Sequence, residues 1–289
     1  AFLSYSLMQL LSPVISCNAA QINTSREIIE TLFSFNISLP FNAVQALIAA
    51  ISIGLVLSFF SSDQLQNYIF QAKGWIEKIL VKFFIPLLPV YVLGFLLKIR
   101  HEGTLACLIE QYGATFLLIV SLQISYLFLL YFVVKGGSFA RGWHAFKTAF
   151  PSYLTAFSTM SSTATVPVSV HAATENTGNR GLADMAMPIM ANVHLLGDSI
   201  STPILALVTM QLFLGALPSV SQYFFFVLYF CSSMFAVSGI PGGGILVMIP
   251  VLSSQLGFTS EMISIITALY FLLDAFGTAA NVMGDGALV

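Results

Sequence analysis

Charged side chains are scarce in this sequence, at 8% of its 289 residues, whereas soluble domains carry about 25%. Hydrophobic residues make up 57% of the chain, aromatic residues 13%, and the mean hydropathy is +0.91. Such a chain has too little polar surface to face water on all sides, so the composition predicts an integral membrane protein in contact with the lipid bilayer. The formal net charge of -2 gives no reason to expect a nucleic acid or another polyanion as a partner.

Cysteine and the common catalytic motifs are also rare or missing. Cys17, Cys107 and Cys231 are odd in number and widely spaced, so we predict neither a disulfide framework nor a metal motif. The sequence has no H-E-x-x-H, no G-x-S-x-G and no GK[ST] after its glycine-rich stretch, which argues against an intramembrane enzyme and a nucleotide loop. Both ends lie inside apolar runs and no cleavable signal is evident, so we expect a fragment of a longer protein.

Apolar runs that are long enough to span a membrane fill the first half of the chain. About 20 apolar residues cross a bilayer as a helix, and the clear candidates are 39–60, 80–97 and 114–134, with 1–16 resembling the end of an earlier span. Alternating spans place seven basic residues on one side and three on the other, which predicts that the richer side is cytoplasmic. The seven are Lys73, Lys78, Lys82, Lys135, Arg141, Lys147 and Arg180.

After about residue 148 the apolar segments become interrupted. SSTATVP at 161–167 and GIPGGG at 239–244 each break an apolar segment, and each is followed by a longer one, for which we predict continuous helices over 184–215 and 262–289. Two such broken segments suggest an internal repeat, with one break entering from each face of the membrane. Glycine- or proline-interrupted segments in corresponding halves are the best sequence indication of a transporter's binding site.

Three aspartates lie within these apolar segments. No Lys or Arg follows Arg180, whereas Asp198, Asp274 and Asp285 are expected at membrane depth, where each costs roughly 3 kcal/mol on insertion scales. Three forms of compensation are open: protonation, which burial favours, a mobile cation, which oxygen ligands suit, or a basic residue from elsewhere in the chain. The simpler alternative is that the aspartates hydrogen-bond to Ser or Thr across helices, and that His194 is a packing histidine.

The two breaks have chemistry of their own. SSTATVP offers hydroxyl groups and the free N–H groups of a helix start, which favour carboxylates. GIPGGG offers a backbone that can unwind, expose its carbonyls and amides, and act as a hinge. Taken singly, the first could be a packing helix rich in Ser and Thr, and the second an ordinary turn outside the membrane. Their occurrence together with DAFGTAANVMGD at 274–285 favours a binding site.

Together these three segments resemble the dicarboxylate/amino acid:cation symporter family, which includes the glutamate transporter homologues. SSTATVP is similar to the tip of that family's first hairpin, and GIPGGG to the tip of its second. The pattern D-x-x-x-T-x-x-N-V-x-G-D, from Asp274 to Asp285, is similar to the signature of its final helix. The likeness runs from about residue 30 to the end of the chain in the same order, and the family's first two helices and most of its third are missing.

The resemblance implies an all-α, multi-span membrane transporter with two re-entrant helical hairpins, which works as an elevator and forms a homotrimer in the inner or plasma membrane. Residues 1–110 would be a partial scaffold region with the end of the third helix and the fourth and fifth helices. Residues 111–289 would be the transport domain. Its parts would be the sixth helix, the first hairpin (about 148–170), the seventh helix (about 184–215), the second hairpin (about 222–257) and the eighth helix (about 262–289).

The resemblance also implies roles for particular residues. Asp274 would hold the ammonium group of the substrate, supported by Thr278, and Asn281, through its carbonyl, would join Asp285 in a Na⁺ site. The first tip and the backbone of the second would hold the substrate's α-carboxylate. The resulting substrate-binding candidates are Ser161, Ser162, Thr163, Gly239, Gly242, Asp274, Thr278 and Asn281, and the expected coupling ion is Na⁺ or H⁺, with no organic cofactor.

Two departures from the family pattern bear on substrate and ion. Members that take acidic substrates carry an arginine where this chain has Gly277, or in some cases Met160, so a neutral amino acid is the favoured substrate. In the seventh-helix motif N-M-D-G-T the aspartate is replaced by Leu196, which makes His194 and Asp198 candidates for proton coupling. The alternatives are a symporter for glutamate, aspartate or C4-dicarboxylates, an uncoupled ion or anion channel, and a truncated chain that does not transport.

Overall fold

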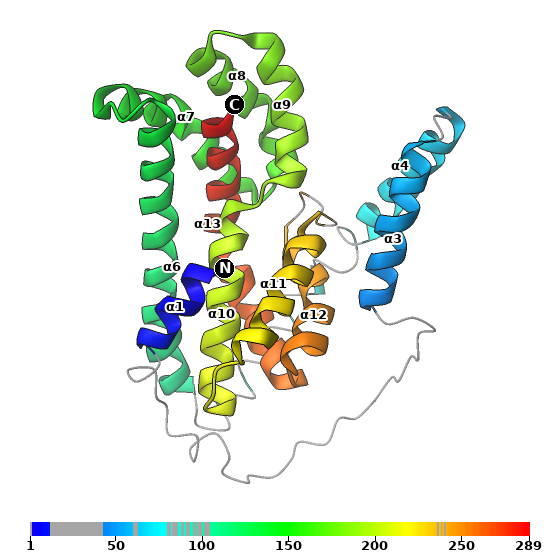
Figure 1. Ribbon diagram of the computed structural model, residues 1–289, viewed down its shortest axis with the longest axis vertical. Helices are drawn as coiled ribbons and strands as arrows, with labels where there is room; N and C mark the ends of the chain where they lie inside the picture. The colour runs from blue at the N-terminus through cyan, green and yellow to red at the C-terminus, as the bar shows by residue number, and fades with distance from the viewer. Residues whose placement is uncertain are drawn as a thin grey trace.

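The computed structural model describes residues 2–11, 43–59, 63–79, 105–235 and 241–289, together with residues 237 and 239 and single residues between 82 and 100. The secondary-structure elements in these ranges are all helices, so the all-α prediction is confirmed for the described part of the chain (Figure 1). The helices are α1 (Phe2–Leu11), α3 (Ala43–Ser58), α4 (Asp63–Ile79), α6 (Leu105–Val134), α7 (Phe139–Thr159), α8 (Ser162–Thr177), α9 (Arg180–Val193), α10 (Leu196–Leu214), α11 (Val220–Met234), α12 (Gly243–Leu256) and α13 (Ser260–Leu288).

Three helical segments of the described chain are long and apolar enough to cross a membrane. They are Ile109–Val134 in α6, Arg180–Leu214, which comprises α9 and α10, and Ser260–Leu288, which is α13. The first and third agree with the spans predicted at 114–134 and 262–289. Helix α3 covers 16 residues of the span predicted at 39–60, and most of the span predicted at 80–97 lies outside the described residues.

The prediction of one continuous helix over 184–215 is wrong. Helix α9 ends at Val193 and α10 begins at Leu196, and the residue between them, His194, has extended backbone with φ -102° and ψ 105°. A continuous helix would bond the Gly197 N–H to the carbonyl four residues earlier. Instead this N–H donates to the side-chain Oδ1 of Asn281 in α13, at 2.6 Å, so a tertiary contact replaces a bond of the helix ladder.

The second half of the chain repeats one arrangement of helices. A pair joined by a break, α7 and α8, is followed by α9 and α10, and a second pair, α11 and α12, is followed by α13 (Figure 1). The first pair is longer than the predicted 148–170, because α7 already begins at Phe139 and α8 continues to Thr177, where Gly178 ends it with φ 69°. The second pair agrees with the predicted 222–257 to within two residues.

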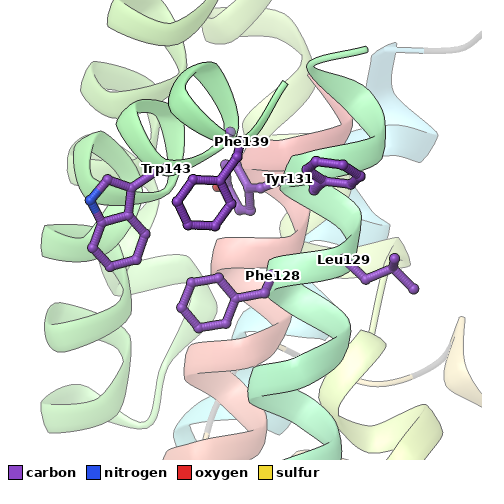
Figure 2. A pocket seen from close by; sticks show the side chains of 7 residues that line it. Phe128, Leu129, Tyr131, Phe139 and Trp143 are labelled. Carbon is purple, nitrogen blue, oxygen red and sulfur yellow. The ribbon is translucent and has the colours of Figure 1, made fainter. Parts of the chain in front are cut away.

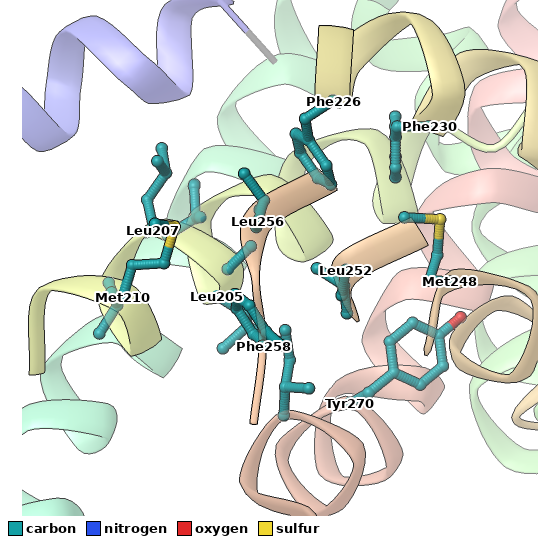
Figure 3. Close-up of a cluster of buried hydrophobic side chains, with 14 of the residues drawn as sticks. Leu205, Leu207, Met210, Phe226, Phe230, Met248, Leu252, Leu256, Phe258 and Tyr270 are labelled. Atoms are coloured by element: carbon teal, nitrogen blue, oxygen red, sulfur yellow. The ribbon is translucent and has the colours of Figure 1, made fainter. Parts of the chain in front are cut away.

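Helix α10 lies at the centre of the molecule and is buried by other helices along most of its length. Its Leu205 and Leu207 belong to a cluster that includes Phe226 and Phe230 of α11, Leu252 of α12 and Tyr270 of α13 (Figure 3). Because lipid is as apolar as leucine, helices in membranes associate by close packing of small residues. Gly197 of α10 provides this contact, since a Cβ at this position would overlap the backbone of Gly277 in α13.

Candidate functional site

The breaks of the two helix pairs meet each other. Ser161 caps α8, since its side chain accepts from the N–H of Ala164 at 3.3 Å. The Ser161 Oγ donates to the carbonyl of Gly239 at 2.8 Å, and the Thr163 Oγ1 donates to the same carbonyl at 3.2 Å. A Cβ at Gly239 would lie 2.9 Å from the Thr163 methyl group. Only glycine therefore fits where the second break touches the first.

The second break is also attached to α13, through Asp274. The N–H of Gly242 donates to Asp274 Oδ2 at 2.8 Å, and Thr278 Oγ1, one turn further along α13, donates to Asp274 Oδ1 at 3.2 Å. Gly242 has φ +71°, a conformation that favours glycine, and the ring of Phe271 fills the space where its Cβ would stand. Asp274 is buried, so this carboxyl group is held by neutral donors next to both breaks.

Asp198 is the centre of a second buried network, which joins α10 to α13. The Tyr270 hydroxyl donates to Asp198 Oδ1 at 2.6 Å, and the Asn281 amide donates to Asp198 Oδ2 at 2.8 Å. The carbonyl of Gly197 accepts from the Gln123 amide of α6 at 3.1 Å. Each carboxyl oxygen of Asp198 thus accepts from a neutral donor. These hydrogen bonds replace the ones to water that the group loses on burial.

Asp285 has a histidine as its partner. His194 Nδ1, at the break between α9 and α10, lies 2.8 Å from Asp285 Oδ1 near the end of α13. Asp285 is completely buried, and its other oxygen, Oδ2, has no hydrogen-bond partner among the described residues. A buried carboxylate oxygen without a donor is a free ligand position for a cation, since hard cations prefer carboxylate oxygens.

Among the described residues, no Lys or Arg side chain compensates the three aspartates. The ion pairs formed within the described chain are His171–Glu175, Arg180–Asp184 and His194–Asp285, and none of these joins a Lys or Arg to Asp198, Asp274 or Asp285. The aspartates rely on hydroxyl, amide, backbone N–H and imidazole groups instead. No group of three or more His, Cys, Asp or Glu side chains in the described part could hold a metal ion.

The structure brings most of the predicted site residues together, but in separate groups. Ser161 and Thr163 meet Gly239, and the buried Ser162 lies between them in sequence. Asp274, Thr278 and Gly242 form a second group, and Asn281 joins Asp198 in a third. His194 and Asp198, predicted as candidates for one role, have different partners: His194 contacts Asp285, whereas Asp198 contacts Tyr270 and Asn281.

Two residues of these networks were missed by the sequence analysis. Tyr270 precedes Asp274 by four residues, so both lie on the same face of α13, and its hydroxyl needs a partner in a buried helix. Gln123 is the only amide side chain in the apolar run 114–134. Both residues could have been found from the sequence: Tyr270 as a polar side chain on the same helix face as Asp274, and Gln123 as a single amide in a membrane span.

Apolar helices of spanning length, and two broken helix pairs that meet beside buried carboxyl groups, are the features of helical membrane transporters. The chain belongs to the sodium:dicarboxylate symporter family, whose model matches residues 7–289. The family consists of transporters and not of enzymes, and its name indicates sodium-coupled transport. This confirms the resemblance inferred from the three sequence segments.

Characterised relatives include both eukaryotic and bacterial transporters. The chain is 25% identical over 255 residues to an excitatory amino acid transporter of Caenorhabditis elegans, which covers 84% of this chain and 49% of the relative. It is 31% identical over 133 residues to excitatory amino acid transporter 3 of Mus musculus, covering 46% of this chain and 25% of the relative. It is 26% identical over 299 residues to the serine/threonine transporter SstT of Acinetobacter baumannii, covering 99% of this chain and 73% of the relative. The chain thus spans about half or less of the two animal relatives.

Proposed function

We propose that the protein is a cation-coupled secondary symporter that imports small amino acids, with a preference for neutral ones. The observation that carries this proposal is the position of Asp274, a buried carboxyl group fixed by Gly242 and Thr278 beside the meeting point of the two breaks. Membership of a symporter family and the match to a serine/threonine transporter over 99% of this chain support it.

Each end of an amino acid would find a complementary group at this place. Asp274 would hold the ammonium group, with Thr278 and Asn281 supporting the site on the same helix. The α-carboxylate would meet Ser161, Ser162 and Thr163 at the start of α8, where free N–H groups and the helix dipole favour an anion. To admit it, the contacts of Ser161 and Thr163 with Gly239 would have to open, and Gly239 and Gly242 supply the backbone freedom for this movement.

The preference for neutral substrates is argued from Gly277 and Met160. The resemblance assigns both positions to arginines in acidic-substrate members, and an arginine binds a carboxylate with two parallel hydrogen bonds. Neither residue can do so, and no atom of another helix lies within 4 Å of the position of a Cβ at Gly277. A transporter of glutamate, aspartate or a C4-dicarboxylate remains the alternative, because animal relatives of the family are named for excitatory amino acids.

Sodium is the first candidate for the coupling ion, because the family is named for it. Asp285 fits such an ion, since its Oδ2 is buried without a partner. Asn281 fits less directly: its side-chain Oδ1 already accepts from the Gly197 N–H, so only the second lone pair of that oxygen is left for an ion. Bound sodium would neutralise the carboxylate during its movement through the membrane. Protons are the alternative, with His194 and Asp198 as the candidate carriers.

The remaining architecture is proposed from family membership. The α7–α8 and α11–α12 pairs would be re-entrant hairpins, and 111–289 would be a transport domain that moves as an elevator against a scaffold containing 1–110. The assembly would be a homotrimer in the inner or plasma membrane. The buried contacts among α6, α10 and α13 support a transport domain that moves as one body.

Uptake into proteoliposomes tests the proposal. Radiolabelled serine, alanine, glutamate and succinate would be offered under an inward Na⁺ gradient, an inward H⁺ gradient or neither. We expect concentrative uptake of serine or alanine that collapses without the gradient. An uncoupled channel would only equilibrate the solute, and concentrative uptake of glutamate or succinate alone would reverse the substrate preference.

A further inference from the structure

The corner between α6 and α7 holds an apolar pocket at the opposite end of α7 from the first break. Its volume is about 320 Å³, and Phe128, Leu129 and Phe132 of α6 line it together with Phe139 and Trp143 of α7 (Figure 2). Leu129 is 55% exposed and Phe139 is 73% exposed, so the pocket opens to the surroundings. Neither the proposed substrate site nor the proposed ion site uses these residues.

Stacked aromatic rings form part of the pocket wall. The rings of Phe128 and Trp143 are stacked with their centroids 5.8 Å apart, and Phe128 and Phe146 are stacked at 4.3 Å. Gly142 lets α7 approach α6, since a Cβ at this position would lie 3.2 Å from the Cα of Phe132. These contacts fix the rings of Phe128 and Trp143 in the pocket wall relative to each other and to α6.

Positive charge is concentrated beside this pocket. Lys135 and Arg141 flank the turn between α6 and α7, and Lys147 follows within α7. Lys135 donates to the carbonyl of Asn176 at 3.2 Å, and the neighbouring Glu175 pairs with His171. The Lys147 ammonium lies 5.2 Å from the centroid of Trp143 in the pocket wall. The Arg141 guanidinium lies over the turn, 3.8 Å from where a Cβ at Gly136 would stand. Within the described chain none of these three cations forms an ion pair with an acidic side chain.

We propose that this corner binds one anionic phospholipid, with an acyl chain in the aromatic pocket and the phosphate at Arg141 and Lys147. The end of a membrane-spanning helix places the pocket where the hydrocarbon of the bilayer meets its headgroups. Basic side chains at this level attract anionic headgroups, and basic residues predominate on the side predicted to be cytoplasmic. The apolar walls suit an acyl chain, and cations without an acidic partner among the described residues favour an anionic headgroup over a zwitterionic one.

Tryptophan fluorescence offers a direct test, because the chain has only two tryptophans, Trp75 and Trp143. In a Trp75→Phe background Trp143 is the sole reporter. The protein would be reconstituted in phosphatidylcholine bilayers with increasing amounts of phosphatidylglycerol whose acyl chains carry bromine, a contact quencher. Brominated phosphatidylcholine is the reference, and unbrominated lipid of each headgroup corrects for direct effects on the indole. We expect stronger quenching by the anionic lipid at equal mole fraction.

Charge variants identify the headgroup contacts. Arg141→Gln and Lys147→Gln should each reduce the preference for brominated phosphatidylglycerol by about fivefold, given about 1 kcal/mol for a basic residue near a membrane surface. Arg180→Gln is the matched control and should leave the preference unchanged, because Arg180 does not line the pocket and already pairs with Asp184. Inorganic phosphate at millimolar concentration should not relieve the quenching. Equal quenching by both lipids, an equal loss in all three variants, or displacement by phosphate would each overturn the proposal.

Discussion

His194 Nδ1 lies 2.8 Å from Asp285 Oδ1, which links the break between α9 and α10 to the end of α13, 91 residues further along the chain. The histidine is partly exposed, whereas the aspartate is completely buried. One carboxyl oxygen thus contacts an imidazole, and the other has no hydrogen-bond partner among the described residues. Three residues after His194, the N–H of Gly197 donates to Asn281, so α13 contacts this break through two side chains.

Replacement of His194 tests the structural value of this pair. His194→Leu removes the partner of a buried carboxyl group and should destabilise the protein by about 1–3 kcal/mol. His194→Asn should retain most of the stability, because an amide can donate to Asp285 from the same place. Thermal unfolding in detergent measures both. If the two variants were equally destabilised, the contact with Asp285 would not be the reason.

The close crossing of α10 and α13 at Gly197 offers a sharp packing test. Gly197→Ala places a methyl group on the backbone of Gly277, so the helices must separate, at a cost of about 1–3 kcal/mol or more. Gly277→Ala is the matched control on the facing helix, since no atom outside its own helix lies within 4 Å of its Cβ position. It should be neutral or stabilising by up to about 1 kcal/mol. Equal melting temperatures for the two variants would contradict this packing.

Asp274 is predicted to bind the substrate ammonium group. Asp274→Asn keeps an acceptor for the Gly242 N–H but removes the negative charge, and a hydrogen bond to a charged group contributes about 1.5–3 kcal/mol. We therefore expect amino-acid affinity to fall about 10- to 150-fold, measured by isothermal titration or as the KM of uptake. Asp184→Asn is the control, because this acid is exposed and pairs with Arg180. Unchanged affinity in Asp274→Asn would remove the residue from the substrate site.

Gly277 is predicted to decide between neutral and acidic substrates. Gly277→Arg introduces a guanidinium group one turn from Asp274, where the facing helices leave space for a Cβ, and it should hold a side-chain carboxylate. Uptake of aspartate or glutamate should appear while uptake of serine or alanine falls, as measured in proteoliposomes. Unchanged neutral uptake without any acidic uptake would show that this position does not face the substrate.

Much of the architecture could be predicted from the order of residues, because the relevant patterns are local. Apolar length indicated the spans of α6 and α13, and runs of Ser, Thr, Gly and Pro indicated both breaks near Ser161 and Gly239. The pattern from Asp274 to Asp285, together with the two breaks, indicated the family. Each of these features depends on residues close together in the chain, so no knowledge of packing was needed.

Other features were decided by tertiary structure. The interruption at His194 was not predicted from the sequence, because it depends on a tertiary contact in which Asn281 accepts from the N–H of Gly197. The sequence alone determined that three acids lie among apolar residues without a neighbouring Lys or Arg. Which group contacts each acid was decided only when the α9–α10 break, α10 and the start of α12 packed against α13: Tyr270 and Asn281 for Asp198, Gly242 and Thr278 for Asp274, and His194 for Asp285. Local composition determines that a polar group is buried, but its hydrogen-bond partner depends on which helix faces lie within about 3 Å of it.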